Sequence, residues 1–164
     1  MRREKGFSLI ELLIVVAIIL IIAAVAIPNL LRARIAANES SAVSSVRTVN
    51  TGEISYISLY PTVGYSGTLA ALGDGGNCPT PPTSASACLI DNVLATNGGG
   101  AGKSGYMFTY TPVVGGTANA SYAINANPIT ANQTGVRSFC SVPDAVVRWQ
   151  IGVVACTKAI PALQ

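Results

Sequence analysis

The sequence contains no histidine, and this absence removes several kinds of chemistry at once. A histidine general base, a histidine-bound zinc ion and a serine–histidine–aspartate triad all need an imidazole ring. Acidic residues are also few, and the six that follow Gly6 lie far apart along the chain. A metal loop or a pair of catalytic carboxylates needs acids that lie close together. We therefore expect no catalytic residue, no bound metal and no cofactor, and we predict that the protein is not an enzyme.

Charged residues of all kinds make up only 10% of the 164 residues. The formal net charge is +3, and the first five residues, with three basic side chains against one acid, supply +2 of it. The basic residues of the later chain are scattered, and we expect them to be solvated: Lys103, Arg137, Arg148 and Lys158. Because a nucleic-acid partner requires a basic patch, this distribution predicts none.

Hydrophobic residues make up 50% of the chain, and the excess is concentrated near the amino terminus. Leu12–Ile27 is an unbroken run of sixteen apolar residues. As a helix, residues 7–31 would be about 37 Å long, which is enough to cross a hydrocarbon core of about 30 Å. We therefore predict a transmembrane helix over residues 7–31, after a short basic segment at residues 1–6.

The charges on either side of this span predict its orientation. Basic residues in the segment before it outnumber Arg32 and Arg34 after it, so the positive-inside tendency places the later chain outside the cytoplasm. A secretory signal cut near Ala23 or Ala26 is the alternative. The apolar run is long for such a signal, and Glu11 lies one turn inside it.

Glu11 is the one acid of the apolar segment. A carboxylate at the centre of a membrane costs about 2.5 to 3.5 kcal/mol, and less near the interface, so it is expected to have a partner. A cut between Gly6 and Phe7 would create an ammonium group four residues before Glu11. This ammonium can pair with Glu11 of its own chain or of a neighbouring chain. In the second case, an unpaired charge in apolar surroundings is costly, so a subunit would join its neighbour only where this pair forms.

The residues Lys5-Gly6-Phe7-Ser8-Leu9-Ile10-Glu11-Leu12-Leu13, with the apolar run up to Pro28, resemble the processing segment of type IV pilins and of type II secretion pseudopilins. The resemblance implies that a prepilin peptidase removes residues 1–6 by cutting after Gly6, and methylates Phe7. It also implies a helical homo-oligomer, built by pilus or secretion machinery from precursors in the inner membrane. One difference is that many pilins have a glycine in this helix before the proline, whereas here none lies between Gly6 and Gly52.

Pro28 removes a helical hydrogen bond to the carbonyl of Ala24 and crowds the preceding turn. Two outcomes stay open at this stage. One is a simple kink, and the other, implied by the resemblance to pilin filaments, is an unwound stretch before Pro28 after assembly. Without the glycine, we expect Leu20–Ile27 to unwind less readily.

Residues 32–60 are predicted to continue the helix as an amphipathic segment that Pro61 ends. Its apolar positions recur at spacings of three, four or seven: Ile35, Ala42, Val43, Val46, Val49, Tyr56, Ile57 and Tyr60. Glycine and proline then indicate a long loop over residues 61–105. Strands are predicted at 106–111, 121–125, 137–142 and 146–154. Residues 61–164 are thus predicted to form a globular head. The helix and strands together predict an α+β fold with a small antiparallel sheet on a long helix, as in pilins.

The four cysteines lie outside the membrane segment and predict disulfides in an oxidising compartment. Three pairings are possible. We favour Cys78 with Cys88, which closes a proline-rich loop, and Cys140 with Cys156, which joins the terminal strands much as the carboxyl-terminal loop is closed in many pilins.

Three hypotheses for the function remain. The first is a structural subunit of a type IV pilus, found in the inner membrane as a precursor and then in an extracellular fimbrium for adhesion or motility. The second is a pseudopilin of a type II secretion system. The third is a monomeric membrane-anchored binding domain, in which Glu11 has no special role.

Overall fold

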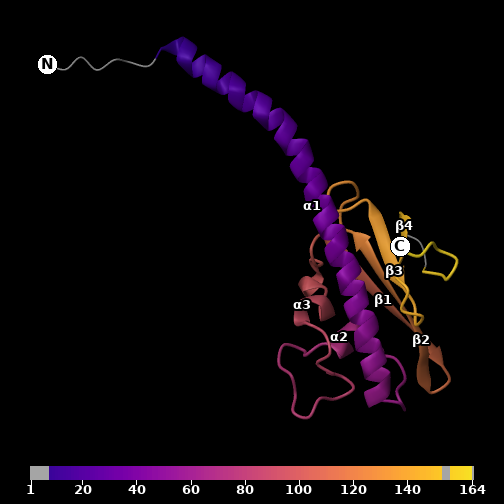
Figure 1. Ribbon diagram of the computed structural model, residues 1–164. Helices are drawn as coiled ribbons and strands as arrows, with labels where there is room; N and C mark the ends of the chain where they lie inside the picture. The colour runs from indigo at the N-terminus through magenta and orange to yellow at the C-terminus, as the bar shows by residue number, and fades with distance from the viewer. Residues whose placement is uncertain (1–7, 153–155, 164) are drawn as a thin grey trace. The chain divides into compact units, whose positions relative to one another are not determined.

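The computed structural model describes residues 8–152 and 156–163. The chain divides into two compact units, Met1–Arg34 and Ile35–Gln164. Figure 1 shows a long helix followed by short helices and a small sheet. The predicted α+β class, with a small antiparallel sheet and a long apolar helix, is confirmed.

Helix α1 runs from Leu9 to Leu59 and contains Pro28. It is helical throughout Leu20–Ile27, so this stretch is not unwound in the single chain. Whether this stretch bends or unwinds in a filament stays a prediction. The helix ends before Pro61 because proline disfavours the helical conformation at the preceding residue, Tyr60.

The sheet has four antiparallel strands in the order β1-β2-β3-β4. They are β1 (Tyr106–Gly115), β2 (Ala118–Pro128), β3 (Arg137–Ser141) and β4 (Arg148–Ile151). The first two are longer than the sequence predicted, because they pair as a hairpin from Tyr106↔Pro128 to Gly115↔Ala118, with a shift of register between Val113 and Val114. Strand β4 is shorter than predicted, and residues 153 and 154 of the predicted strand lie outside the described residues.

The segment predicted as a long loop contains three short helical turns. They are α2 (Leu69–Leu72), α3 (Asn92–Ala95) and the 3₁₀ turn η1 (Gly98–Gly100). The side chains of Thr68 and Asp91 cap α2 and α3 by accepting hydrogen bonds from backbone N–H groups. Helices of four residues are too short to show a period in the sequence, so the pattern indicated only a loop.

The core of the second unit lies between α1 and the sheet. Ala42, Val46, Val49 and Tyr56 of α1 are buried in one cluster with residues of the sheet. These four belong to the apolar positions that the sequence assigned to the covered face of the helix. Among the others, Val43 and Tyr60 pack partly against the cluster, and Ile35 and Ile57 are half-buried.

Glu53 and Asn50 are among the polar residues of α1 that are buried at this apolar interface. Glu53 is fully buried and accepts hydrogen bonds from the Ser66 N–H at 2.9 Å, the Ser66 hydroxyl and the Tyr110 hydroxyl at 2.6 Å. Burial, together with the hydrogen bond to Glu53, raises the pKa of Tyr110, so this phenol remains a donor. Because hydrogen bonds are directional, these contacts fix the rotation of α1 against β1.

Asn50, one turn earlier in α1, also fixes the helix against the sheet through hydrogen bonds. Its amide donates to the Ser141 hydroxyl at 2.9 Å and to the Ala145 carbonyl at 3.2 Å, and it accepts from the Tyr122 hydroxyl at 3.0 Å. Asn50 therefore joins α1 to β2 and to the turn after β3.

The Glu53 contacts predict a large effect on stability. Glu53→Ala removes an acceptor from three donors. The two hydroxyls keep a second acceptor, because Ser66 also donates to the Tyr110 hydroxyl at 3.0 Å and Tyr110 to the Ser66 carbonyl at 2.9 Å, whereas the buried Ser66 N–H loses its acceptor. The free energy of unfolding is therefore expected to fall by about 1 to 3 kcal/mol. Glu53→Gln keeps one carbonyl acceptor and should lose less. Unfolding of the full chain in detergent, followed by near-ultraviolet circular dichroism, measures both. Ile54→Ala, at an exposed neighbouring position, is the control and should change stability by less than about 0.5 kcal/mol. A loss for Glu53→Ala no greater than for Ile54→Ala would contradict the assigned role.

Candidate functional site

The first part of α1 exposes a long apolar surface. Every large apolar side chain from Leu9 to Leu31 is between 44% and 79% exposed. The most apolar stretch of 18 residues has a mean hydropathy of 3.3, and none of it is buried. By length and composition the helix is able to cross a membrane. Its surface therefore requires cover from outside the chain, either by lipid or by other helices.

Glu11 lies in the first turn of this helix. Its carboxylate oxygen Oε2 accepts a hydrogen bond from the backbone N–H of Ser8 at 2.9 Å. Ser8 directly precedes Leu9, the first helical residue, so Glu11 occupies the third helical position. This is the glutamate half of a capping box, in which a serine and a glutamate three residues later close the start of a helix.

The capping contact was missed in the sequence, although Ser8-Leu9-Ile10-Glu11 has the required S-x-x-E spacing. It gives Glu11 a local role, because the positive end of a helix also stabilises a carboxylate in the first turn. Within the described residues only Oε2 of this carboxylate accepts a hydrogen bond, and Oε1 remains available for a second donor.

Gly6 and Phe7 lie outside the described residues. The predicted cleavage after Gly6, the methylation of Phe7 and the pairing of its amino group with Glu11 therefore remain proposals.

An ion pair joins α1 to the start of β3. Glu39 is buried and accepts hydrogen bonds from the backbone N–H groups of Val136 at 3.0 Å and Arg137 at 3.1 Å, and from Nε of Arg137 at 2.8 Å. The guanidinium of Arg137 also lies over the rings of Phe139 and Trp149, 5.6 and 5.5 Å from their centres. Burial alone would raise the pKa of Glu39, but the hydrogen bonds from Val136 and Arg137 outweigh it and lower the pKa.

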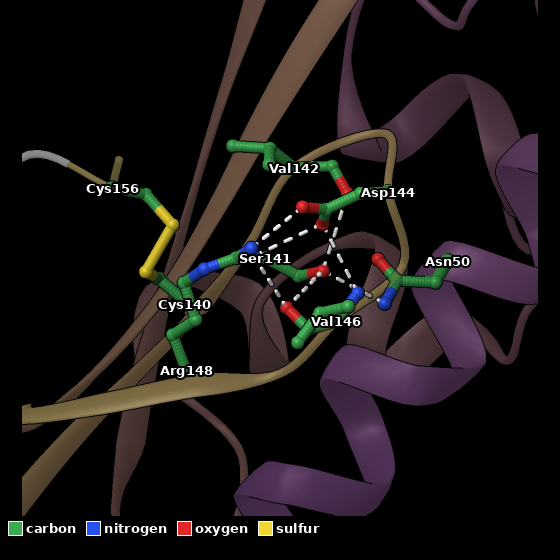
Figure 2. Close-up of a disulfide and its surroundings, with 8 residues drawn as sticks. All are labelled: Asn50, Cys140, Ser141, Val142, Asp144, Val146, Arg148 and Cys156. Atoms are coloured by element: carbon green, nitrogen blue, oxygen red, sulfur yellow. Dashed lines mark hydrogen bonds and ion pairs between the residues drawn. A yellow bond between two sulfur atoms is a disulfide. The ribbon is translucent and has the colours of Figure 1, made fainter. Parts of the chain in front are cut away.

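The structure contains the disulfides Cys78–Cys88 and Cys140–Cys156, which are the pairs favoured from the sequence. Figure 2 shows the second of them at the end of β3, beside the turn that leads to β4. In that turn the carboxylate of Asp144 accepts two hydrogen bonds from the guanidinium of Arg148, at 3.0 and 2.6 Å. The bonds to Arg148 outweigh burial and lower the pKa of Asp144.

The prediction that the scattered basic residues are solvated is wrong for three of them. Lys103 pairs with Asp91, Arg137 with Glu39 and Arg148 with Asp144, and Arg148 is only 6% exposed. Glu39 and Arg137 lie 98 positions apart, so the sequence did not reveal their pairing. Asp144 and Arg148 lie only four positions apart, and this local pair was overlooked. Among the residues that the structure describes, no group of three or more potential ligands is placed to hold a metal ion.

These features define a protein with a membrane-type helix at its amino terminus and a disulfide-bonded α+β head. Residues 1–27 match the family model of the prokaryotic N-terminal methylation motif. A type IV wide pilus major component of Thermus thermophilus, PilA4, is 70% identical over 40 residues, which are 24% of this chain and 30% of that protein. A type IV major pilin protein of Myxococcus xanthus, PilA, is 45% identical over 56 residues, 34% of this chain and 26% of that protein.

The chain therefore carries an N-terminal methylation motif, and its relatives over this segment are type IV pilins. The resemblance stated from the sequence is confirmed there. The matches span less than a third of the length of either relative. No solved structure gives a significant match to the chain.

The Glu39 contacts predict how stability depends on pH. The pKa of Glu39 is lower in the folded chain than its ordinary value of 4.5, so its contribution is fully present above pH 4.5. That contribution should be lost as the pH falls through the lower pKa of the folded state. Glu39→Gln is expected to lower the free energy of unfolding at neutral pH by about 1 to 3 kcal/mol. The variant should also lose less stability than the wild type as the pH falls below 4.5.

Free energies of unfolding of both proteins across this pH range provide the measurement. Because Asp144 titrates in the same range, the difference between the two curves isolates Glu39. If the free energies of unfolding of the two proteins fell in parallel with pH, Glu39 would contribute nothing to the loss of stability in acid.

Proposed function

We propose that this protein is a structural subunit of a type IV pilus and that it polymerises through the first part of α1. The observation that carries the proposal is the exposed apolar surface from Leu9 to Leu31, with Glu11 at its start. This surface lies in the segment that matches the methylation motif and the two pilins. In this role the chain has no catalytic function.

The proposed path begins in the inner membrane, with the head outside the cytoplasm. A prepilin peptidase removes residues 1–6 after Gly6 and methylates Phe7. Methylation of the amino group retains its positive charge. The mature helix then exchanges its lipid cover for the apolar helices of other subunits as assembly machinery adds it to an extracellular filament.

Glu11 supplies the selective step in this path. In the single chain one carboxylate oxygen accepts the Ser8 N–H, which leaves the other oxygen open to a donor. We assign to that oxygen the ammonium group of Phe7 on a neighbouring subunit. An ion left unpaired among apolar helices is strongly unfavourable, so a subunit docks stably only where this pair forms.

The head is suited to the outer surface of such a filament. Glu39, Asn50 and Glu53 fix residues 39–53 of α1 against the sheet, so the head and its part of the helix form one rigid piece. Two disulfides add covalent links in the oxidising space outside the cytoplasm. Exposed loops on this piece are then available for adhesion or motility.

A pseudopilin of a secretion system would use the same helix and the same pairing. The two relatives are both named as pilus subunits, and this favours the pilus. In a monomeric membrane-anchored domain, Glu11 would act only as a helix cap.

Two substitutions at Glu11 separate charge pairing from capping. Glu11→Ala removes both the charge and the capping acceptor, whereas Glu11→Gln removes the charge and keeps an oxygen that can accept from Ser8. If charge pairing drives assembly, both variants should lower the amount of sheared filament by at least about a hundredfold while the precursor remains in the membrane.

Gly6→Val serves as the control for processing. Its chain should keep residues 1–6, which mass spectrometry detects as a heavier protein, and it should not assemble. Normal filaments from Glu11→Gln would contradict the pairing and leave capping as the only role of Glu11. Filaments made of chains that still contain residues 1–6 would contradict the processing step.

A further inference from the structure

Two arginines follow the apolar surface of α1 directly. Arg32 comes right after Leu31, Arg34 lies two residues further, and both are exposed. With a rise of 1.5 Å per residue, Arg32 lies about 32 Å along the helix from Glu11. This spacing is close to the thickness of a hydrocarbon core, about 30 Å. When Glu11 lies near one face of a membrane, the arginines lie in the headgroup layer of the other face.

Neither arginine has an acidic partner on its own helix. The sequence has no acid between Glu11 and Glu39. The carboxylate of Glu39 is already bound to the backbone of Val136 and to Arg137. The guanidinium groups of Arg32 and Arg34 therefore offer their donors to an anion from outside the helix.

We propose that Arg32 and Arg34 bind the phosphate groups of anionic phospholipids where α1 leaves the membrane. This inference rests on the proposed function, because it concerns the membrane-inserted subunit before assembly. Arginine is suited to the task, since its planar guanidinium binds phosphate through two parallel hydrogen bonds. Residues two apart point to nearly opposite sides of a helix, so the two arginines contact separate lipids on either side of it.

The contacts set the depth of the helix and resist its removal. A basic residue near an anionic membrane surface strengthens binding by about fivefold, so the pair contributes about 25-fold. A subunit that leaves the bilayer must give up both phosphates. Anionic lipid therefore stabilises the inserted subunit against premature release.

The test uses the full chain in nanodiscs of phosphatidylcholine with phosphatidylglycerol. Native mass spectrometry of the ejected protein counts the lipids that remain bound. The wild-type chain should retain about two more phosphatidylglycerol molecules than the double variant Arg32→Gln/Arg34→Gln, one for each guanidinium. The basic residues at positions 2, 3 and 5 are present in both proteins and cancel in this comparison.

Arg47→Gln is the matched control, because Arg47 is also an exposed arginine of α1 but belongs to the second unit. It should retain as many phosphatidylglycerol molecules as the wild type. Equal retention by the double variant and the wild type, or the same loss in Arg47→Gln, would overturn the proposal.

A separate measurement distinguishes this failure from failure of the proposed function. Extraction of vesicles at alkaline pH tells whether the wild-type chain is integral to the membrane. A chain that is integral but has no preference for phosphatidylglycerol overturns only the lipid contact. A chain that is extracted overturns both.

Discussion

The structure depends on an apolar helical surface that its own chain does not cover. From Leu9 to Leu31 the large side chains of α1 are exposed, and burying such surface is the largest favourable term available to the protein. In the proposed path, lipid supplies the cover before assembly, and neighbouring helices supply it afterwards. Since both environments are apolar, the hydrophobic effect by itself hardly distinguishes them. Selection between them must come from a polar contact, and Glu11 is the acid of this surface.

The later part of the same helix packs against the head of its own chain. Between Ile35 and Leu59, α1 is amphipathic, and its covered face carries Glu39, Asn50 and Glu53 among apolar residues. Apolar packing tolerates sliding and rotation, whereas each of these three side chains bonds to groups at fixed positions in the head. The apolar cluster thus provides the stability of the unit, and the polar contacts provide its register.

Much of this arrangement was predictable from the sequence because it rests on local patterns. Hydropathy and the spacing of apolar residues predicted the long helix, and Pro61 predicted its end. Short apolar stretches between turn residues predicted the four strands. The capping contact from Ser8 to Glu11 was equally local and was overlooked. Other contacts had no local signal: Glu53 meets Tyr110 across 57 positions, and Glu39 meets Arg137 across 98. Without the fold, nothing in the sequence brings such pairs together, which is why Arg137 was mistaken for a solvated residue.

The most direct test of the account is a helical reconstruction of sheared filaments at a resolution that shows side chains. The account predicts that each chain begins at Phe7 and that its amino nitrogen lies about 3 Å from a Glu11 carboxylate of a neighbouring chain, inside a bundle of apolar helices. A filament in which Glu11 faces water, or in which the apolar helices do not contact one another, would contradict it.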